Sequence, residues 1–523
     1  MKRKTPAPGV RISEVTSPNT IVSVATAVPA FIGYAPQAEY KGKSYYNQPV
    51  KITSFADFKA FFMLKDPPAE PAKQYNPQYY PVAQAAEPGM GNYLKIGGNF
   101  YSIFPDPGTV YYLYNSVRLF YQNGGGDAYV VAVDGYGPPT GNPHANPGTP
   151  VINPNVRLKD LLAGLASLQN EREPTLYICP EATLLTRQDN AVLTQAMLLQ
   201  AAQMRTALCL FDIIGGKEPD PVLFMKDIEN FRAGTGDVGL GYGAGYYPFL
   251  HTGIMQQDEI DFTNLFGGDT AQLEPLLNPP EAPDKTVAGI LKMIESLPAP
   301  PLTNGELQAA LVNASPAYAQ IIERVFHDAN TLPPSGAMAG VYTMNDYAYG
   351  VWKAPANVGI DDATGLTINL NDDQHAALNV DAVSGKSVNA IRFFNGRGIL
   401  AWGARTLDGN SDDWRYVNVR RTVTFIEQSI KLAMQAYVFA PNDSNTWAAV
   451  KSMIENFLTG VWMQGGLMGA QAADAFSAQI GLGSTMTSDD ILNGLMRAEI
   501  LIAVTHPAEF IELTVEQQQT QSA

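Results

Sequence analysis

In the second quarter of the chain, apolar strands alternate with amphipathic helices, and this pattern limits the possible folds more than any other feature. The sequence predicts buried strands at Ala128–Val133, Thr175–Cys179 and Ala207–Asp212. Leucines between Leu158 and Leu168 recur at helical spacing, and a second helix is predicted across Ala191–Met204. Strands that alternate with helices form βαβ units, so we predict an α/β fold built on a mostly parallel sheet.

The chain of 523 residues divides into three predicted parts. Residues 1–24 contain prolines that forbid a continuous helix and an alternating stretch at Val10–Val15, so they are expected to form an extended arm. Residues 25–339 form the α/β domain, with insertions at about 36–110 (Tyr- and Pro-rich, irregular) and 265–335 (helical). Residues 340–523 contain all five tryptophans, which suggests a tightly packed α+β C-terminal domain.

Three helices and a terminal strand are predicted within this C-terminal domain. The helices cover about residues 420–437 and 447–463, and a third begins at Ser488. Near the end of the chain, Phe510 is followed by Ile511, Leu513 and Val515 in alternation with polar residues. An isolated strand of this kind, like the N-terminal arm, needs a sheet to join.

Composition excludes several classes of function. The 34 Lys and Arg against 50 Asp and Glu give a net charge of −16, which disfavours binding to nucleic acid. Charged residues make up 16% of the chain against about 25% in ordinary domains, which suggests surface buried against other copies. No signal peptide is visible, and the apolar runs are shorter than the roughly 18 residues of a membrane span, so we expect a protein made in the cytoplasm without membrane insertion.

The common catalytic, metal and cofactor motifs are missing or incomplete. The five histidines are scattered, and Cys179 and Cys209 are interpreted as small buried hydrophobic residues. Gly234–Gly239 fits G-x-G-x-x-G, but a helical pattern precedes it where a dinucleotide fold has a strand. Ser384–Ser387 lacks the first glycine of a phosphate-binding loop, and no G-x-S-x-G motif occurs. We therefore predict no enzyme activity, no cofactor and no metal site.

Several blocks of residues, in order, resemble the tail sheath proteins of contractile phage tails and phage-tail-like injection systems. The densest similarity covers residues 340–518 and 6–35. The blocks are Pro8–Val15, Val28–Gly33, Gly350–Asn357, Val388–Arg392, Gly396–Ile399, Trp402–Leu407, Tyr416–Arg421 and Pro507–Phe510. The structural residues that the family motif places in this chain are Trp352, Lys353, Asn357, Arg392, Arg397, Trp402, Arg405, Arg420 and Arg421.

The resemblance implies a structural role for the chain. Subunits would polymerise as helically stacked rings, sixfold in this family, around an inner tube, and contract from a metastable extended state. The middle domain would have a subtilisin-like topology without an active site and face outward, and the C-terminal domain would face the tube. The arm and the last strand would complete sheets of neighbouring subunits. The linking residues would be Val10, Ile12, Val15, Ile21 and Val22 in the arm, and Phe510, Ile511, Leu513 and Val515 in the strand.

The resemblance also implies partners: further copies of the chain, the inner tube protein, and baseplate and tail-terminator proteins, with no direct contact to nucleic acid. The particle would be a phage tail or a phage-tail-like device. Two other classes of function stay open from the sequence. One is a non-contractile assembly protein of the surface-layer kind, and the other is an α/β enzyme with a cryptic site.

Overall fold

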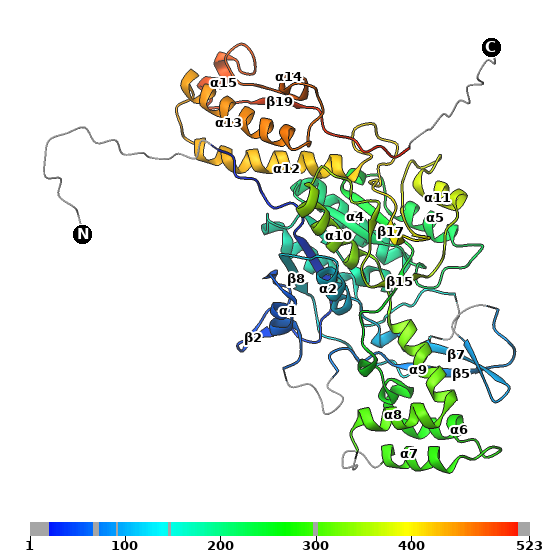
Figure 1. Ribbon diagram of the computed structural model, residues 1–523. Helices are drawn as coiled ribbons and strands as arrows, with labels where there is room; N and C mark the ends of the chain where they lie inside the picture. The colour runs from blue at the N-terminus through cyan, green and yellow to red at the C-terminus, as the bar shows by residue number, and fades with distance from the viewer. Residues whose placement is uncertain (1–19, 66–72, 90–92, 145–147, 296–301, 511–523) are drawn as a thin grey trace, which may run out of the picture. The chain divides into compact units, whose positions relative to one another are not determined.

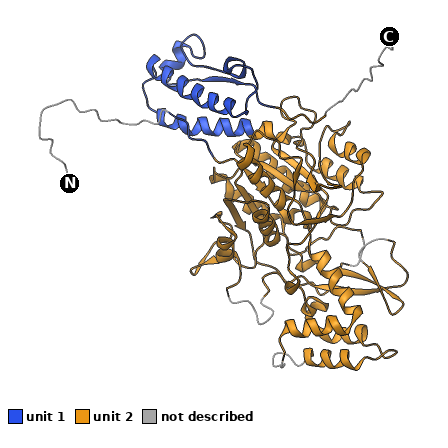
Figure 2. Cartoon of the chain, viewed as in Figure 1, with its two compact units in different colours: residues 1–24, 422–505 blue, residues 25–421, 506–523 orange. Residues whose placement is uncertain are grey.

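The computed structural model describes residues 20–65, 73–89, 93–144, 148–295 and 302–510 (Figure 1). The chain forms two compact units, which Figure 2 colours separately. Unit 1 comprises residues 1–24 and 422–505, and unit 2 comprises residues 25–421 and 506–523. The structure therefore divides the chain elsewhere than at the predicted boundary of residue 340. The helix α10 (Ser335–Tyr349) runs across that boundary, and strands after it join the sheet of unit 2.

Unit 2 is built on a nine-stranded sheet in the order β14-β17-β16-β11-β10-β9-β1-β8-β4. The six strands from β16 to β8 run parallel, while β4, β17 and β14 are antiparallel to their neighbours. Every residue of β1, β8, β9, β10 and β11 is buried, as expected for a parallel sheet covered on both faces. The strands are β1 (Pro29–Gly33), β4 (Val50–Ile52), β8 (Ala128–Ala132), β9 (Leu176–Ile178), β10 (Leu208–Asp212), β11 (Gly243–Tyr247), β14 (Val358–Gly359), β16 (Asn389–Phe394) and β17 (Gly398–Ala401).

Helices cover both faces of this sheet. The helices α2 (Leu113–Gln122) and α10 pack together on one face, and α3 (Leu158–Ser167), α4 (Arg187–Met204) and α5 (Met225–Gly234) pack on the other. The predicted α/β fold with a large, mostly parallel sheet is thus confirmed. The close approach of α10 to α2 depends on glycine, because a Cβ at Gly336 or Gly340 would lie 2.5 Å from a carbonyl oxygen of α2.

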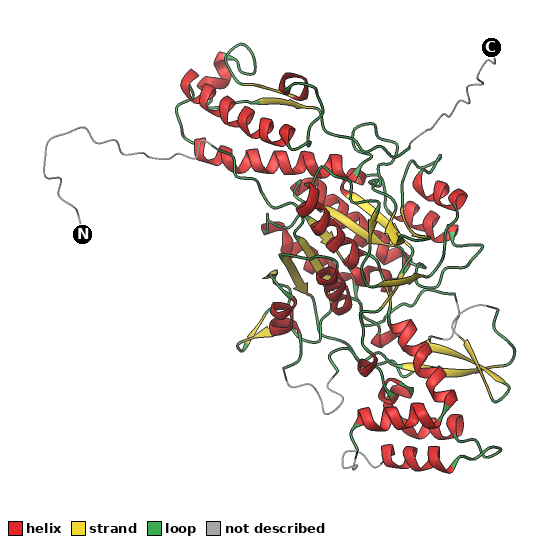
Figure 3. Ribbon diagram, viewed as in Figure 1, coloured by secondary structure: helices red, strands yellow, loops and turns green. Residues whose placement is uncertain are grey.

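The two predicted insertions contain different structures (Figure 3). The first holds more regular structure than expected: the β2–β3 hairpin (Glu39–Tyr40, Lys43–Ser44), α1 (Phe55–Phe62) and an antiparallel sheet of β5 (Tyr79–Gln84), β7 (Asn99–Pro105) and β6 (Tyr93–Ile96). The second is helical, as predicted, with α6 (Leu273–Leu277), α7 (Lys285–Glu295), α8 (Asn304–Ala314) and α9 (Pro316–Ala329). A further small sheet joins β13 (Thr331–Leu332), β12 (Leu250–Thr252) and β15 (Ala363–Leu366).

Unit 1 consists of helices and one small sheet. Its long helices are α12 (Val417–Met434), whose first five residues, 417–421, belong to unit 2, and α13 (Ser444–Met463). Asp443 caps α13 by accepting hydrogen bonds from the N–H groups of Asn445 and Thr446, both at 3.0 Å. The other elements are α14 (Ala472–Ala475), β18 (Phe476–Gln479), α15 (Ser488–Leu492) and β19 (Glu499–Ile502).

The tryptophans, which the sequence analysis assigned to one C-terminal domain, are divided between the two units. Three of them, Trp352, Trp402 and Trp414, belong to unit 2, whereas Trp447 and Trp462 belong to unit 1, and each is only half-buried. Their indole groups serve local contacts, such as the hydrogen bond from Trp447 to Asn442. Among the helices of the described residues, none combines the length and apolar character that crossing a membrane requires.

Candidate functional site

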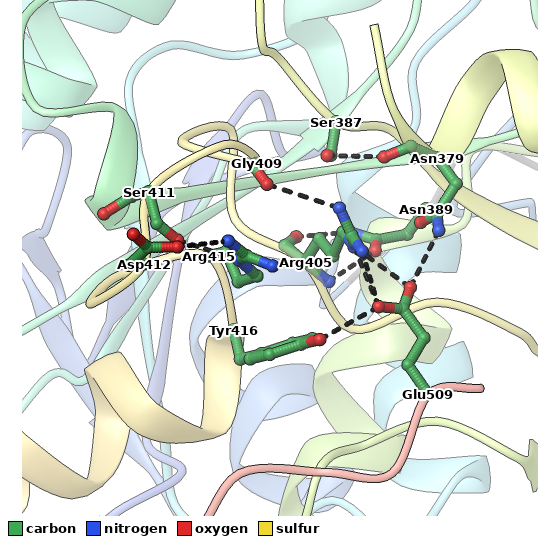
Figure 4. Close-up of polar contacts among 10 residues, drawn as sticks. All are labelled: Asn379, Ser387, Asn389, Arg405, Gly409, Ser411, Asp412, Arg415, Tyr416 and Glu509. Carbon is green, nitrogen blue, oxygen red and sulfur yellow. Dashed lines mark hydrogen bonds and ion pairs between the residues drawn. The ribbon is translucent and has the colours of Figure 1, made fainter. Parts of the chain in front are cut away.

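Glu509 directly precedes the predicted C-terminal strand, and three side chains of unit 2 hold its carboxylate (Figure 4). Arg405 donates from Nε at 3.0 and 3.1 Å and from Nη2 at 2.6 Å. Asn379 donates from Nδ2 at 2.7 Å, and the Tyr416 hydroxyl donates at 3.0 Å. The Arg405 side chain is 5% exposed and that of Glu509 is 22% exposed. These bonds fix the backbone at the root of the predicted strand.

Arg405 is itself held in place by its surroundings. Its backbone N–H donates to Asn389 Oδ1 at 2.8 Å, and Asn389 lies on β16 of the central sheet. Its Nη1 donates to the carbonyl of Gly409 at 3.3 Å, and Arg405 and Tyr416 form an antiparallel β-bridge. The guanidinium therefore meets Glu509 in a preorganised geometry, anchored to the large sheet.

The pKa of Glu509 reflects this environment. Burial alone raises the pKa of the carboxyl group, but the hydrogen bonds from Arg405, Asn379 and Tyr416 outweigh burial and bring the pKa below its ordinary value. Glu509 is consequently a carboxylate at neutral pH, and its contact with Arg405 is a charged, bidentate pair.

A second buried arginine holds the root of the N-terminal arm. Arg421 forms an ion pair with Asp346 at 2.6 Å, and both side chains are 4% exposed. The same guanidinium donates to the backbone carbonyl of Thr26 at 2.9 Å. Close by, the N–H of Val28 donates to Thr175 Oγ1 at 2.8 Å, where β1 begins. Residues 26 and 509, both in unit 2, are thus each held by a buried arginine of the same unit.

The other residues of the predicted family motif support the scaffold of unit 2. Arg420 lies over the ring of Trp414, with 3.4 Å between guanidinium carbon and ring centroid, and donates to the Tyr242 hydroxyl at 3.2 Å. Two more arginine contacts are Arg392 with Asp372, at 2.7 Å, and Arg397 with Asn357. Further motif contacts include Arg397 over the ring of Trp402, the carbonyl of Trp352 accepting from Asn418, and Nζ of Lys353 donating to the carbonyl of Ala354.

Most of the predicted linking residues lie outside the described residues: Val10, Ile12, Val15, Ile511, Leu513 and Val515. The structure places three of the set. Ile21 is half-buried, Val22 is 71% exposed, and Phe510 is 74% exposed. Two apolar residues thus present most of their surface to solvent, close to the roots of the two terminal segments.

The small sheet of unit 1 has two open edges. The strands β18 and β19 pair antiparallel, from Phe476 opposite Ile502 to Gln479 opposite Glu499, and no further described strand joins them. In the same register, the N–H of Ala503 donates to the carbonyl of Ala475. Because residues alternate along an antiparallel pair, the N–H and C=O groups of Ile500 and Ile502 point away from β18. They are available to another strand.

Glu181 occupies the place where an α/β sheet of this kind would bind a ligand. The strand order reverses at β1, with β8 on one side and β9 to β11 on the other, and doubly wound folds bind anions at such a point. Here the carboxylate of the fully buried Glu181 accepts from the N–H groups of Tyr112, at 3.2 Å, and Leu113, at 2.7 Å, at the start of α2. Burial raises its pKa to about 7. The chain's own carboxyl group therefore accepts the hydrogen bonds that these two N–H groups could offer to an anion.

Sequence reasoning did not single out Glu181 or Glu509, although both carry a recognisable signal. Glu181 is an acidic residue just beyond a buried strand, and Glu509 lies within the Pro507–Phe510 block. The histidines are less scattered than predicted, because the rings of His251 and His327 lie 4.2 Å apart. Within the described parts of the chain, no group of three or more His, Cys, Asp or Glu is arranged to hold a metal ion.

Comparison with known proteins points to one family. Residues 410–518 match the model of the phage tail sheath C-terminal domain. The tail sheath protein of Vibrio phage KVP40 is 27% identical over 172 residues, which cover 32% of this chain and 25% of that protein. The chain thus matches about a quarter of the length of this curated relative.

Solved structures of contractile particles contain chains with the same fold. A chain of the anti-feeding prophage (AFP) baseplate is 25% identical, with a TM-score of 0.57 over 99% of this chain and 100% of that one. A chain of the contracted sheath complex of PVC, an extracellular contractile injection system, is 24% identical, with a TM-score of 0.56 and complete coverage of both chains. Its C-terminal residues 410–518 thus match the phage tail sheath domain, and the chain is similar to tail sheath proteins, the family that its sequence motifs resemble.

Proposed function

We propose that the chain is the structural subunit of a contractile sheath. Copies polymerise as helically stacked rings around an inner tube and contract from a metastable extended state, which drives the tube into a target envelope. The tail sheath C-terminal domain and the full-length similarity to a chain of the AFP particle support this assignment. The observation that carries it is the combination of two anchored chain ends with a two-stranded sheet whose outer edges are open.

The open sheet explains how subunits would link. A two-stranded sheet is marginally stable by itself, so strands donated by neighbouring subunits would stabilise β18 and β19. We assign this role to the arm, through Val10, Ile12, Val15, Ile21 and Val22, and to the C-terminal strand, through Phe510, Ile511, Leu513 and Val515. Backbone pairing depends little on side-chain identity, so it can persist while subunits move relative to one another.

The fixed residues next to the two terminal segments would transmit force between subunits. A linking strand transmits force only if its root is fixed to the body of its own subunit. The pair Arg405–Glu509, in which only the arginine is buried, fixes residue 509 in this way, and the buried pair Arg421–Asp346 fixes residue 26. The link would then run from the central sheet of one subunit, through a backbone-paired strand, into the next subunit.

Contraction in this proposal needs no catalytic step. Additional surface buried between subunits in the shorter state would release the free energy, at about 25 cal/mol per Å² of apolar area. The carboxylate of Glu181 at the switch point agrees with a chain that binds no nucleotide there. We therefore propose a non-enzymatic role, with a subtilisin-like middle domain facing outward and a C-terminal domain facing the tube.

The proposed partners follow from this role. They are other copies of the chain in sixfold rings, the inner tube protein, and baseplate and tail-terminator proteins. The chain would be made in the cytoplasm and become part of a phage tail or phage-tail-like particle.

Removal of residues 1–24 tests the proposal. The purified full-length chain is expected to form hollow striated tubes in negative-stain electron micrographs. The truncated chain should stay folded, with a circular dichroism spectrum like that of the full-length protein, but form no tubes. Tubes at the full-length yield would contradict the linking role of the arm, and a single helical pitch under all conditions would contradict contraction.

A further inference from the structure

The chain contains four Asn-Gly pairs, whose chemistry depends on how the fold holds them. They are Asn123–Gly124, Asn304–Gly305, Asn395–Gly396 and Asn493–Gly494. An asparagine that precedes glycine can lose its side-chain amide group, because glycine has no Cβ to hinder attack by its backbone nitrogen on the asparagine side chain. The attack requires a backbone nitrogen that is free of hydrogen bonds, and the later steps require access for water.

Asn395 and Gly396 lie in the turn between β16 and β17 of unit 2. Both residues are exposed, and a Cβ placed on Gly396 would have no atom within 4 Å. The N–H of Arg397 closes the turn by donating to the carbonyl of Phe394 at 3.0 Å. Within the described residues, neither the N–H of Gly396 nor the side chain of Asn395 makes a hydrogen bond. The attacking nitrogen and the amide group are therefore both open to water.

The fold protects the other three pairs. Asn123 is 5% exposed, and its side-chain amide donates to two backbone carbonyls. Asn304 is 6% exposed and begins the helix α8. Asn493 is exposed like Asn395, but the N–H of Gly494 donates to a backbone carbonyl at 3.0 Å. Asn493 therefore differs from Asn395 mainly in the hydrogen bond that its glycine makes.

We propose that Asn395 is a site of spontaneous deamidation through a succinimide. The backbone nitrogen of Gly396 forms a bond to Cγ of Asn395, the bond between Cγ and Nδ2 breaks, and Nδ2 leaves as ammonia with the proton of the Gly396 nitrogen. Water then opens the succinimide at one of its two carbonyl carbons. Opening at Cγ gives aspartate, and opening at the backbone carbonyl gives isoaspartate, in which the main chain runs through Cγ. The reaction consumes water and needs no oxidant or reductant.

Deamidation changes the surroundings of a residue that makes structural contacts. The strands β16 and β17 pair up to Phe394 and Gly398, on either side of the turn. Within the turn, Arg397 donates to Oδ1 of Asn357 and lies over the ring of Trp402. The product carries a new carboxylate next to these contacts, and isoaspartate also lengthens the main chain of the turn. The proposal does not depend on the sheath role, because the turn lies within one subunit.

Incubation of the full chain in water enriched in oxygen-18, at mildly alkaline pH, tests the proposal. Both products gain an oxygen atom from water, so mass spectrometry of tryptic peptides locates the reaction. Trypsin cleaves after Arg392 and Arg397, which isolates Asn395 in the peptide 393–397. We expect Asn395 to take up label about tenfold faster than Asn493, whose glycine must first lose a hydrogen bond. Asn395→Gln should show almost no label in this peptide, because glutamine closes a larger and less favoured ring.

The same measurement in guanidinium chloride removes the influence of the fold, and all four pairs should then take up label at similar rates. Two outcomes would overturn the proposal. The first is uptake at Asn395 in the folded chain that is no faster than uptake at Asn493. The second is uptake at Asn395 that is more than about tenfold slower in the folded chain than in guanidinium chloride, which would show that the closed turn prevents ring formation.

Discussion

Arginine rather than lysine is the residue suited to the two chain-end anchors. The guanidinium of Arg405 makes three contacts with Glu509 and one with the carbonyl of Gly409, and that of Arg421 reaches both oxygens of Asp346 and the carbonyl of Thr26. A planar fork with five donors satisfies a carboxylate and a carbonyl at once, whereas an ammonium group acts as a single point charge. At each root, one side chain therefore fixes two separate stretches of backbone.

Glu509→Gln should loosen the root of the C-terminal strand. The neutral amide keeps its size but loses the charged pair with Arg405, which is 5% exposed. We expect hydrogen exchange of the amides of residues 506 and 508–510 to become about tenfold faster, as for the loss of about 1.4 kcal/mol. Asp412→Asn is the control, because Asp412 also pairs with an arginine, Arg415, but is 98% exposed. Equal acceleration in both variants would contradict the anchoring role.

The lowered pKa of Glu509 fixes the pH range of this anchor. A carboxyl group with a lowered folded-state pKa stabilises the structure above its unfolded pKa, near 4.3, and loses that contribution as pH falls through the folded value. The contact between Glu509 and Arg405 should therefore persist at pH 5 and above. After correction for the intrinsic pH dependence of exchange, the amides of residues 506 and 508–510 should exchange equally slowly throughout that range.

Asp212 and Glu181 should make the fold less stable as pH rises toward neutrality. Both are buried, and burial raises the pKa of each to about 7. The folded state then binds more protons than the unfolded state between about pH 4 and 7. The free energy of unfolding is therefore highest below about pH 4 and decreases as the pH rises to about 7. For a single such group, the free energy of unfolding decreases by an amount on the order of 3–4 kcal/mol.

Urea unfolding at pH 5 and pH 8 measures this effect. Asp212→Asn and Glu181→Gln can keep the hydrogen bonds that Asp212 accepts from the N–H of Ser335 and Glu181 from the N–H of Leu113, since each amide retains an acceptor oxygen. Both variants should narrow the difference in unfolding free energy between the two pH values. A difference as large as in the natural chain would show that these carboxyls do not titrate between them.

At the scale of elements, proline substitution separates the two edges of β19. Ile500→Pro removes an N–H that points away from β18, so it should leave the intramolecular pairing intact while blocking an added strand. Leu501→Pro removes an inward N–H and should destabilise unit 1 itself.

Negative-stain microscopy and thermal unfolding distinguish these effects. Ile500→Pro should abolish striated tubes, but the melting temperature of the variant should stay within about 3 °C of that of the natural chain. Such a shift corresponds to a small change in the free energy of unfolding. Leu501→Pro should lower the melting temperature by more. Tubes at the natural yield from Ile500→Pro would rule out strand addition at this edge.

The elements that the sequence predicted are those with long, local patterns. The strands β8, β9 and β10 and the helices α4, α12 and α13 lie within a few residues of their predicted bounds, because periodicity over several turns or a run of buried residues is visible locally. The short strands β4, β14 and β18 were not predicted. Each has two to four residues, and its pairing partner lies far along the chain or has no distinct pattern.

The same limit applies to the anchors. Arg405 was predicted as a motif residue, but its partner lies 104 residues away, and sequence spacing alone does not reveal such a pair. The pairing of Arg421 with Asp346 and Thr26 likewise depends on the completed fold. Sequence motifs therefore located one half of each anchor, and only the tertiary structure supplied the other.

At the scale of the whole molecule, net charge sets the conditions for assembly. A chain with 34 basic and 50 acidic residues carries a net charge of −16, so copies stacked in the proposed sheath would repel one another at long range. Backbone pairing and apolar contacts, which act at short range, must overcome this repulsion. Salt reduces the repulsion, because the screening length falls from about 30 Å at 0.01 M to about 10 Å at 0.1 M ionic strength.

Assembly should therefore be favoured by salt. We expect the critical concentration for tube formation, measured by sedimentation, to fall several-fold between 10 and 150 mM NaCl, in proportion to the shorter screening length. The Ile500→Pro variant is the control, since it lacks the proposed link and should stay in the supernatant at both concentrations. A critical concentration that rises with salt would mean that attraction between opposite charges dominates the subunit interface, because screening weakens attraction and repulsion alike.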